Sequence, residues 1–505
     1  MKARIPWVLR LRGKTLFLPK QGNGFEARRI HADKTMIFIG DAGFCIAVGF
    51  VAGTLAAGLG WRFLDTALLA AVSASVFACY PGRRREARLV FAAVSLAALF
   101  AGMLYYSFFA SRRAAAMDFP SGRSVSFTAI ISGEPKMSAD WLLLPADLEK
   151  PYAGEVTIFL APGGGFRYGE EVAVSGDIEP PEAAGDDPAV FPKTISVIAE
   201  GKGFWLSEGL LDLKAAILEK FSEALPGDMA ALLGGETLGG TGGMSAAFKS
   251  QMSASGTSYI VSMYGYKISV LVFVLDGMLG GFVGRRARLP AIAAVVVLFV
   301  LMSGGNVSAV RAAVMAILAL AAKMIGRVFD PRNALALTAA GMALGDPALP
   351  AQAAFELSFL SIAGIFYLAG PLEKFFRWDG RGPGMLAWRT GTVLAIASLL
   401  PIVPVIVAAF GDFSLMAFPS NILIFPAVTP SMFCGALVAG LGFAAPPLAM
   451  FAARLASPLL YYQAAVIRIF AGLAVPLPFP FGSFFAVAVY YGSLGIFAYY
   501  YHEKA

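Results

Sequence analysis

The chain has 505 residues, of which 58% are hydrophobic and only 14% are charged, and its mean hydropathy is +0.70. Soluble globular chains carry about 25% charged residues, so this composition excludes a soluble enzyme and indicates an integral membrane protein. At about 20 apolar residues per span, there is room for about a dozen helices, which excludes a single-span receptor. Two histidines and three cysteines without a C-x-x-C motif exclude a histidine-rich metal site, a zinc ribbon and a disulfide framework.

The positive charge is concentrated at the start of the chain. Residues 1–34 hold nine Lys and Arg against two acidic residues, an excess of seven that equals the formal net charge of the whole chain. By the positive-inside rule, we expect a basic cytoplasmic tail over residues 1–34 and a first span that leads outward. The tail and the apolar run after it are too long for a cleaved signal peptide. The expected location is the cytoplasmic (inner) membrane, with several passes and the N-terminus in the cytoplasm.

Three apolar runs, at 35–59, 66–80 and 89–110, predict an N-terminal three-helix membrane region over residues 35–113. Residues 114–210 then change character. Five runs of strand length, at 124–132, 141–148, 155–161, 171–178 and 194–206, predict a small all-β barrel or sandwich outside the cytoplasm. This domain holds six basic and fifteen acidic residues, so it is no electrostatic trap for nucleic acid. Apolar positions every three or four residues over 211–226 predict an amphipathic interfacial helix.

Residues 227–505 predict a transmembrane domain. The stretch 227–255 contains too many Gly and Ser for a plain span, and irregular backbone at membrane depth persists only where it lines a cavity or is covered by protein. Together with further apolar runs, these segments predict a polytopic α-helical membrane protein of about 11–12 spans with an inserted extracytoplasmic β domain. They lie at 256–283, 289–302, 307–325, 334–344, 350–370, 386–410, 421–443, 447–473 and 481–501.

Four ionisable residues fall inside these runs, and such residues are functional candidates because a charge within the membrane is costly. They are Lys267, Asp276, Arg311 and Glu356. Lys267 and Asp276 are nine residues apart and lie on opposite faces of an unbroken helix, so each needs a partner elsewhere. Two interpretations stay open. The charges form interhelical ion pairs that hold the bundle, or Lys267 and Arg311 face an aqueous path and meet an anion, with Glu356 in a structural role.

Small polar residues mark the same segment. Ser255, Ser258, Ser262 and Ser269 follow helical spacing, which is typical either of close helix packing or of a wetted wall. Gly265 permits a break in the helix, and discontinuous helices suit anions.

Enzyme motifs are not evident. Residues 13–15, Gly-Lys-Thr, resemble the end of a P-loop, but a valine stands at position 8 where the motif needs glycine, so the match is fortuitous. We expect no catalytic residue, no metal site, no cofactor and no ATP-driven motor in this chain.

One segment resembles a known family. Residues 256–268, GTSYIVSMYGYKI, are similar to the GTSHLLAISGLHV signature of the ComEC/Rec2 competence proteins, the inner-membrane DNA channels of natural transformation. Further matches follow in order: 303–316 resembles AGFSPSVLRAALMA, 330–337 resembles DPLNALALA, and 355–359 resembles FQLSF. Residues 410–414 and 419–421 also resemble a later segment of the family.

The resemblance implies membrane helices before an extracytoplasmic OB-like domain over residues 35–225, and a competence helical domain over 230–475. Lys267 and Glu356 stand where the family has His and Gln, which predicts an ion pair between them. The metallo-β-lactamase-like nuclease of many members has no counterpart in this sequence, so degradation of the non-transported strand, if it occurs, is expected either of a separate nuclease or of a domain that lies outside this sequence. Residues expected on the DNA path or in the family motifs are Gly256, Thr257, Ser258, Ser262, Gly265, Lys267, Asn306, Ser308, Arg311, Glu356, Ser358 and Asn421.

The expected function is therefore an inner-membrane channel that translocates single-stranded DNA into the cytoplasm during natural transformation. Expected partners are single-stranded DNA, membrane lipids, a periplasmic or surface DNA receptor and a cytoplasmic ATP-driven helicase-like motor. The basic tail is equally suited to docking the motor and to binding anionic lipid headgroups. One alternative is a transporter of a small anionic solute, which predicts an internal repeat and a tight closed site. Another is a membrane enzyme for lipid-linked substrates, which requires clustered carboxylates or histidines at one interface.

Overall fold

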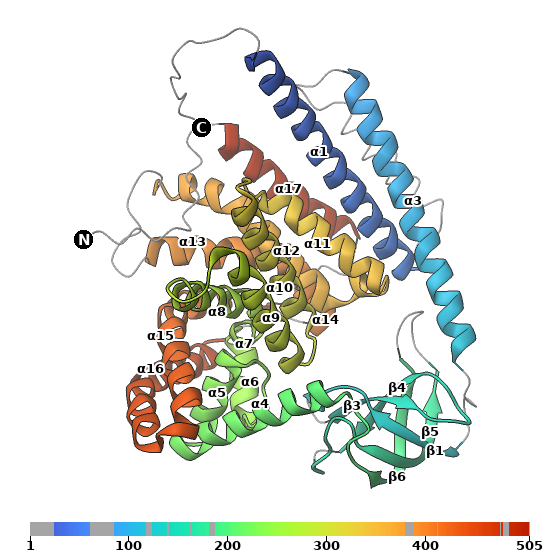
Figure 1. The fold of residues 1–505 in the computed structure, drawn as a ribbon, viewed down its shortest axis with the longest axis vertical. Coiled ribbons are helices and arrows are strands. Elements are labelled where there is room, and N and C mark those ends of the chain that lie inside the picture. The colour runs from blue at the N-terminus through green and yellow to red at the C-terminus, as the bar shows by residue number, and fades with distance from the viewer. Residues whose placement is uncertain are drawn as a thin grey trace.

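The structure is a computed structural model that describes residues 25–60, 85–117, 124–138, 141–161, 163–180, 187–378, 388–411, 413–474, 476–477 and 484–503. It is mostly helical, with one small β-barrel placed after the second described helix. Figure 1 shows the barrel at the far end of α3 and at the start of α4, beside the mass of helices.

Helices α1 (Phe25–Gly58) and α3 (Arg85–Ala116) run side by side along one flank of the molecule (Figure 1). Glycines allow the close approach: a Cβ added at Gly53 would overlap the backbone of Leu99, so a larger residue would force the helices apart. These helices match the first and third predicted spans. The predicted second span, 66–80, and most of the predicted basic tail lie outside the described residues.

The barrel is built from five strands: β1 (Ser124–Ile131), β3 (Trp141–Leu148), β4 (Glu155–Leu160), β5 (Glu171–Glu179) and β6 (Ala189–Ala199). It closes because β1 pairs with both β5 and β3, and the order around the barrel is β1-β5-β6-β4-β3. The β4–β6 pair is parallel and the other pairs are antiparallel. The short strand β2 (Lys136–Ser138) pairs antiparallel with β3. Alternate residues point inward, and Val172, Val174 and Ile178 on β5 are almost completely buried in the barrel core.

The last predicted strand was wrong in its limits. It was expected at 194–206, whereas β6 begins at Ala189 and ends at Ala199, and helix α4 begins at Trp205. Proline inside the run obscured the strand, because proline cannot donate a ladder hydrogen bond. Pro192 is tolerated because it faces Gly176 next to a register shift, where the regular ladder is interrupted.

The helical domain begins with α4 (Trp205–Ala224), which covers the predicted amphipathic segment and packs against α5, α9, α15 and α16. The glycine-rich stretch forms two short helices, α5 (Gly227–Thr237) and α6 (Ala246–Ala254), instead of one span, as the sequence indicated. The run 256–283 was predicted as one span but forms two helices, α7 (Ser258–Ser262) and α8 (Tyr264–Leu279). The run 386–410 is likewise divided, into α13 (Trp388–Leu399) and α14 (Val403–Phe410), by a 3-10 turn at Leu400–Ile402 that contains Pro401.

The remaining helices follow the other predicted runs closely. Each stands within a few residues of the limits that apolar patterning gave. They are α9 (Arg285–Met302), α10 (Val307–Ile325), α11 (Pro331–Gly345), α12 (Ala353–Phe375), α15 (Ala417–Ala444), α16 (Pro446–Gly472) and α17 (Phe484–Glu503).

Six stretches of the described helices are long and apolar enough to cross a membrane: Asp41–Gly58, Val90–Ala116, Val307–Ile325, Ala353–Phe375, Trp388–Phe410 and Ala417–Ala444. The described fold is therefore mostly helical, with six candidate membrane-spanning stretches and a small five-stranded β-barrel. The larger number of 11–12 spans stays a prediction.

Candidate functional site

The candidate site lies around an interruption between two consecutive helices, α7 and α8. Helix α7 ends and α8 begins at Met263, whose φ of −76° and ψ of 59° are not helical. The break was expected at Gly265, two residues later. The carbonyl of Val261 would bond to the amide of Gly265 in a continuous helix; here it accepts from the side chain of Lys267 at 2.7 Å. The lysine therefore satisfies a carbonyl that the break releases.

Lys267 is the buried cation at the centre of the site. Its side chain is only 3% exposed, and besides Val261 it donates to the carbonyl of Gly235 at 2.6 Å, near the end of α5. The ammonium lies 4.6 Å from the centroid of the Tyr264 ring. Carbonyls at helix C-termini carry partial negative charge, so the contacts with α5 and α7 are electrostatically favourable.

The carboxylate beside Lys267 is Glu236, not Glu356. Glu236 is completely buried and interacts electrostatically with Lys267. Among the ion pairs of the described residues, none joins Lys267 to Glu356, so the predicted pair is not formed. Glu356 is half-buried on α12, where its charge acts on Tyr491 of α17.

Glu236 belongs to a small polar cluster inside the helices. It accepts a hydrogen bond from the hydroxyl of Ser431 on α15, and that hydroxyl accepts one from the side-chain amide of Gln463 on α16 at 3.2 Å. All three residues are fully buried, and one oxygen each of Glu236 and Gln463 has no hydrogen-bond donor among the described residues. Sequence reasoning missed this cluster. Its only signal was a single acid in the otherwise uncharged run 229–238.

Arg311 joins three of the segments that carry the family resemblance. It is 5% exposed on α10 and donates to the carbonyl of Ser358 on α12. Its guanidinium carbon lies 5.9 Å from the centroid of the Phe359 ring. A Cβ at Gly265 would lie 3.2 Å from Nη2 of Arg311, so glycine there leaves room for the guanidinium.

A fourth segment that resembles the family, 419–421 on α15, packs against the same region. Asn421 donates to the carbonyl of Gly256 at 3.0 Å, and Ser420 donates to the carbonyl of Ser255 at 2.9 Å. Gly256 has a φ of +68°, in the left-handed region, and a Cβ there would overlap Ala417. Glycine at 256 is thus required both by the turn and by the approach of α15.

The other predicted site residues have local roles. The hydroxyl of Thr257 is buried and lies 2.8 Å from that of Ser255. Asn306 caps α10 by accepting from the backbone amide of half-buried Ser308 at 3.0 Å. Ser258 is exposed, and the side chain of Ser262 lies outside the described residues.

The predicted serine stripe does not run along one helix. Ser255 follows α6, Ser258 lies on α7 and Ser269 lies on α8, where it donates to its own helix at 2.8 Å. Because the chain turns between these helices, helical spacing does not align the side chains on one face. Asp276 has partners on other helices, as expected: Arg288 at 3.1 Å and Lys323 at 2.9 Å.

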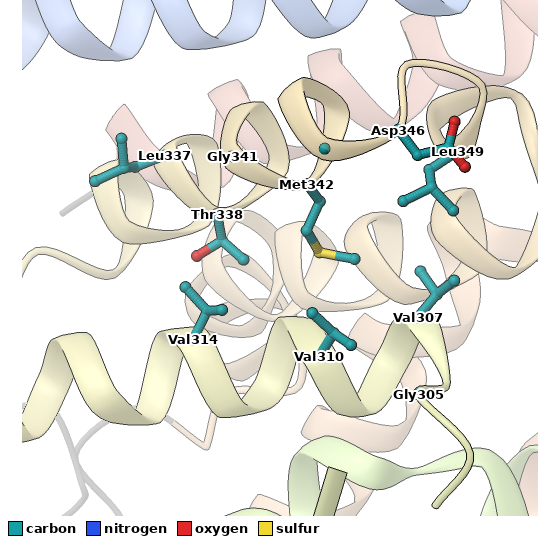
Figure 2. A pocket seen from close by; sticks show the side chains of 11 residues that line it. Gly305, Val307, Val310, Val314, Leu337, Thr338, Gly341, Met342, Asp346 and Leu349 are labelled. Atoms are coloured by element: carbon teal, nitrogen blue, oxygen red, sulfur yellow. The ribbon is translucent and has the colours of Figure 1, made fainter. Parts of the chain in front are cut away.

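A cavity of about 410 Å³ lies between α10 and α11 (Figure 2). Val307, Val310 and Val314 line one wall, and Met342 points into it from α11 (Figure 2). No lysine or arginine is among the described residues that line it, so this cavity does not suit a polyanion. Within the described part of the chain, no group of three His, Cys, Asp or Glu side chains is placed to hold a metal.

The barrel surface carries an ion pair of its own. Lys202, just before α4, lies 2.9 Å from Glu171 of β5. This hydrogen bond lowers the pKa of the Glu171 carboxyl below its ordinary value, and it raises the pKa of the Lys202 ammonium. The pair ties the segment after β6 back to β5.

These features define a class: a multi-helix protein with six candidate membrane spans and a small barrel. Its helices surround a buried polar layer made of Lys267, Glu236, Ser431 and Gln463. The chain belongs to the competence protein family of the ComEC/Rec2 type, because the family model described as "Competence protein" matches residues 237–504, more than half of the chain. The matched part includes Lys267, Arg311 and Asn421 but not Glu236. No curated protein and no solved structure is significantly similar to the chain.

Proposed function

We propose that this protein is a channel of the cytoplasmic membrane that passes single-stranded DNA into the cytoplasm during natural transformation. Membership of the competence family supports a role in DNA uptake. The observation that carries the proposal is the convergence on Arg311. It donates to the carbonyl of Ser358, lies over the ring of Phe359, and occupies the space that the missing side chain of Gly265 leaves.

A path for a polyanion needs water and spaced cations. Lys267 and Arg311 supply two such charges close to the α7–α8 break, and both are buried here. We therefore interpret the present arrangement as a closed state, in which both cations donate to backbone carbonyls and Glu236 offsets the charge of Lys267. Opening would separate α8 and α10 from α5 and α12 and exchange these internal partners for phosphates. The break at Met263 is a suitable hinge, because it divides the segment without stretching a continuous helix.

The barrel suits contact with single strands. In chain order the five barrel strands are β1, β3, β4, β5 and β6. The third and fifth, β4 and β6, are parallel, and the first, β1, pairs with the second and fourth, β3 and β5. This topology supports an OB-like assignment. Trp141, Phe159 and Phe191 form an aromatic group on β3, β4 and β6, with ring centroids 5.3–6.4 Å apart. Trp141 is 45% exposed. Because stacking on aromatic rings is independent of charge, the acidic barrel can still guide bases.

The other expectations belong to the same proposal. The barrel faces outward and receives DNA from a periplasmic or surface receptor. The chain acts as a passage and not as an enzyme, so a cytoplasmic ATP-driven motor pulls the strand and a separate nuclease removes its complement.

Charge reversal at Arg311 tests the proposal. Arg311→Glu should abolish entry of labelled DNA into the cytoplasm and leave surface binding intact, whereas Arg311→Lys should retain part of the entry. Arg327→Glu is the matched control, because Arg327 is exposed just after α10. Membrane levels of each variant are compared by immunoblot. Normal entry through Arg311→Glu at wild-type levels removes this residue from the path.

A further inference from the structure

An ion pair joins the barrel to the helical domain. Both carboxylate oxygens of Glu134, in the loop between β1 and β2, accept from the ammonium of Lys214 on α4, at 2.6 and 2.8 Å. The side chain of Lys214 is only 6% exposed, while that of Glu134 is 28% exposed. A lysine so deeply buried requires an anion, and the barrel provides it.

The carboxylate of Glu134 also reaches the turn between α9 and α10. A Cβ added at Gly304 would lie 3.0 Å from Oε2 of Glu134, and Gly304 has a φ of +72°, so a larger residue there is disfavoured on two grounds. This turn belongs to the segment 303–316 that resembles the family motif. An acid of the barrel is therefore seated against the helical core.

The pair lies beside the buried polar layer. The charge of Glu134 acts on Tyr264, and the charge of Lys214 acts on Lys267. Two buried lysines repel each other, and Glu134 is the carboxylate that offsets this repulsion at Lys214. If Glu134 withdraws, the site has an uncompensated positive charge and attracts another anion.

We propose that Glu134 and Lys214 form a latch between the barrel and the helical domain, and that a DNA phosphate displaces Glu134 from Lys214 when a strand enters. A phosphodiester carries one negative charge and two free oxygens, as the carboxylate does. The exchange frees the β1–β2 loop from the Gly304 turn, so arrival of the strand is coupled to release of the barrel. This inference rests on the proposed function, since it names the first phosphate site of the same path.

The test measures binding of a fluorescent oligothymidylate to the full-length protein in detergent. Glu134→Gln should bind about tenfold more tightly than wild type, as expected if the latch is open about a tenth of the time. The logarithmic salt dependence should be the same for wild type and Glu134→Gln, because both complexes make the Lys214–phosphate contact, and it should fall by about 0.7, the increment for one phosphate contact on a single strand, when the Lys214 cation is removed. Lys214→Met in the Glu134→Gln background should remove the gain, and Lys214→Arg in that background should keep it, which separates loss of the cation from loss of folding.

Glu171→Gln is the matched control, because it removes one negative charge from the same barrel but from the pair with Lys202. An equal gain from Glu171→Gln, or a gain that persists without the Lys214 cation, overturns the latch and leaves the channel function intact. If no variant binds the oligonucleotide and deletion of the gene leaves DNA entry unchanged, the proposed function and the latch both fail.

Discussion

Replacement of Lys267 by methionine tests the buried polar layer. The substitution keeps the volume of the side chain but removes the ammonium that donates to Gly235 and Val261 at 2.6 and 2.7 Å. It also leaves Glu236 buried without its cation. Removing one partner of a buried charge pair costs about 3–5 kcal/mol, and each buried carbonyl left unsatisfied adds about 1–3 kcal/mol. Because these effects are not additive, we expect a loss of about 4 kcal/mol of unfolding free energy.

Neutralising the carboxylate should reverse part of this loss. In the double variant Lys267→Met, Glu236→Gln, we expect recovery of about 2 kcal/mol, since no charge is then buried alone. Lys323→Met is the control: its side chain is 61% exposed, so loss of the pair with Asp276 should cost less than about 1 kcal/mol. Stability is measured by denaturant titration of the purified variants in detergent micelles. The reasoning is refuted if Lys267→Met is as stable as wild type, or if Glu236→Gln adds to its loss.

Three further predictions concern other parts of the molecule. Gly256→Ala should lower the unfolding free energy by at least about 2 kcal/mol, because φ is +68° and α15 lies against the turn. Gly277→Ala is the control and should not lower it, because no atom lies within 4 Å of the added Cβ. Equal effects of the two substitutions contradict this. Asn421→Ala should cost about 1–3 kcal/mol by leaving the Gly256 carbonyl unpaired, as measured in the same titration, and an unchanged midpoint argues against the bond. The pKa of Glu171 is lowered and the pKa of Lys202 is raised, so their ion pair stabilises the fold between the ordinary pKa values of 4.5 and 10.5. Lys202→Met should therefore be less stable than wild type at about pH 7, and this deficit should disappear at about pH 3, where acid protonates Glu171. Thermal unfolding at the two pH values measures this, and a deficit that persists in acid contradicts it.

Patterns local in sequence were predictable. The limits of α10, 307–325, are those of the predicted apolar run. The structure gives the physical reason: Asn306 caps the start of the helix, and Gly326 ends it in the left-handed conformation. Four of the five barrel strands followed from apolar runs separated by turn residues. β6 did not, because tolerance of Pro192 depends on its irregular pairing with β5, which the run itself does not encode.

The partners in the site were less predictable, because they depend on distances between remote segments. Lys267 was recognised as a buried charge, but its carboxylate was assigned to Glu356 from two substitutions relative to the family pattern. Folding places Glu356 near α17 and brings Glu236, Ser431 and Gln463 together from three helices. The break at Met263 was displaced from the flexible glycine because the side chain of Lys267 satisfies the carbonyl that the break releases.

The central claim is passage of single-stranded DNA, and uptake in living cells tests it most directly. Cells in which the gene is deleted, and then restored, receive labelled DNA, and the label bound outside is scored separately from the label that reaches the cytoplasm. The account predicts that deletion abolishes cytoplasmic label while surface binding is retained, and that restoration of the gene recovers entry. Unchanged entry in the deletion strain would contradict it.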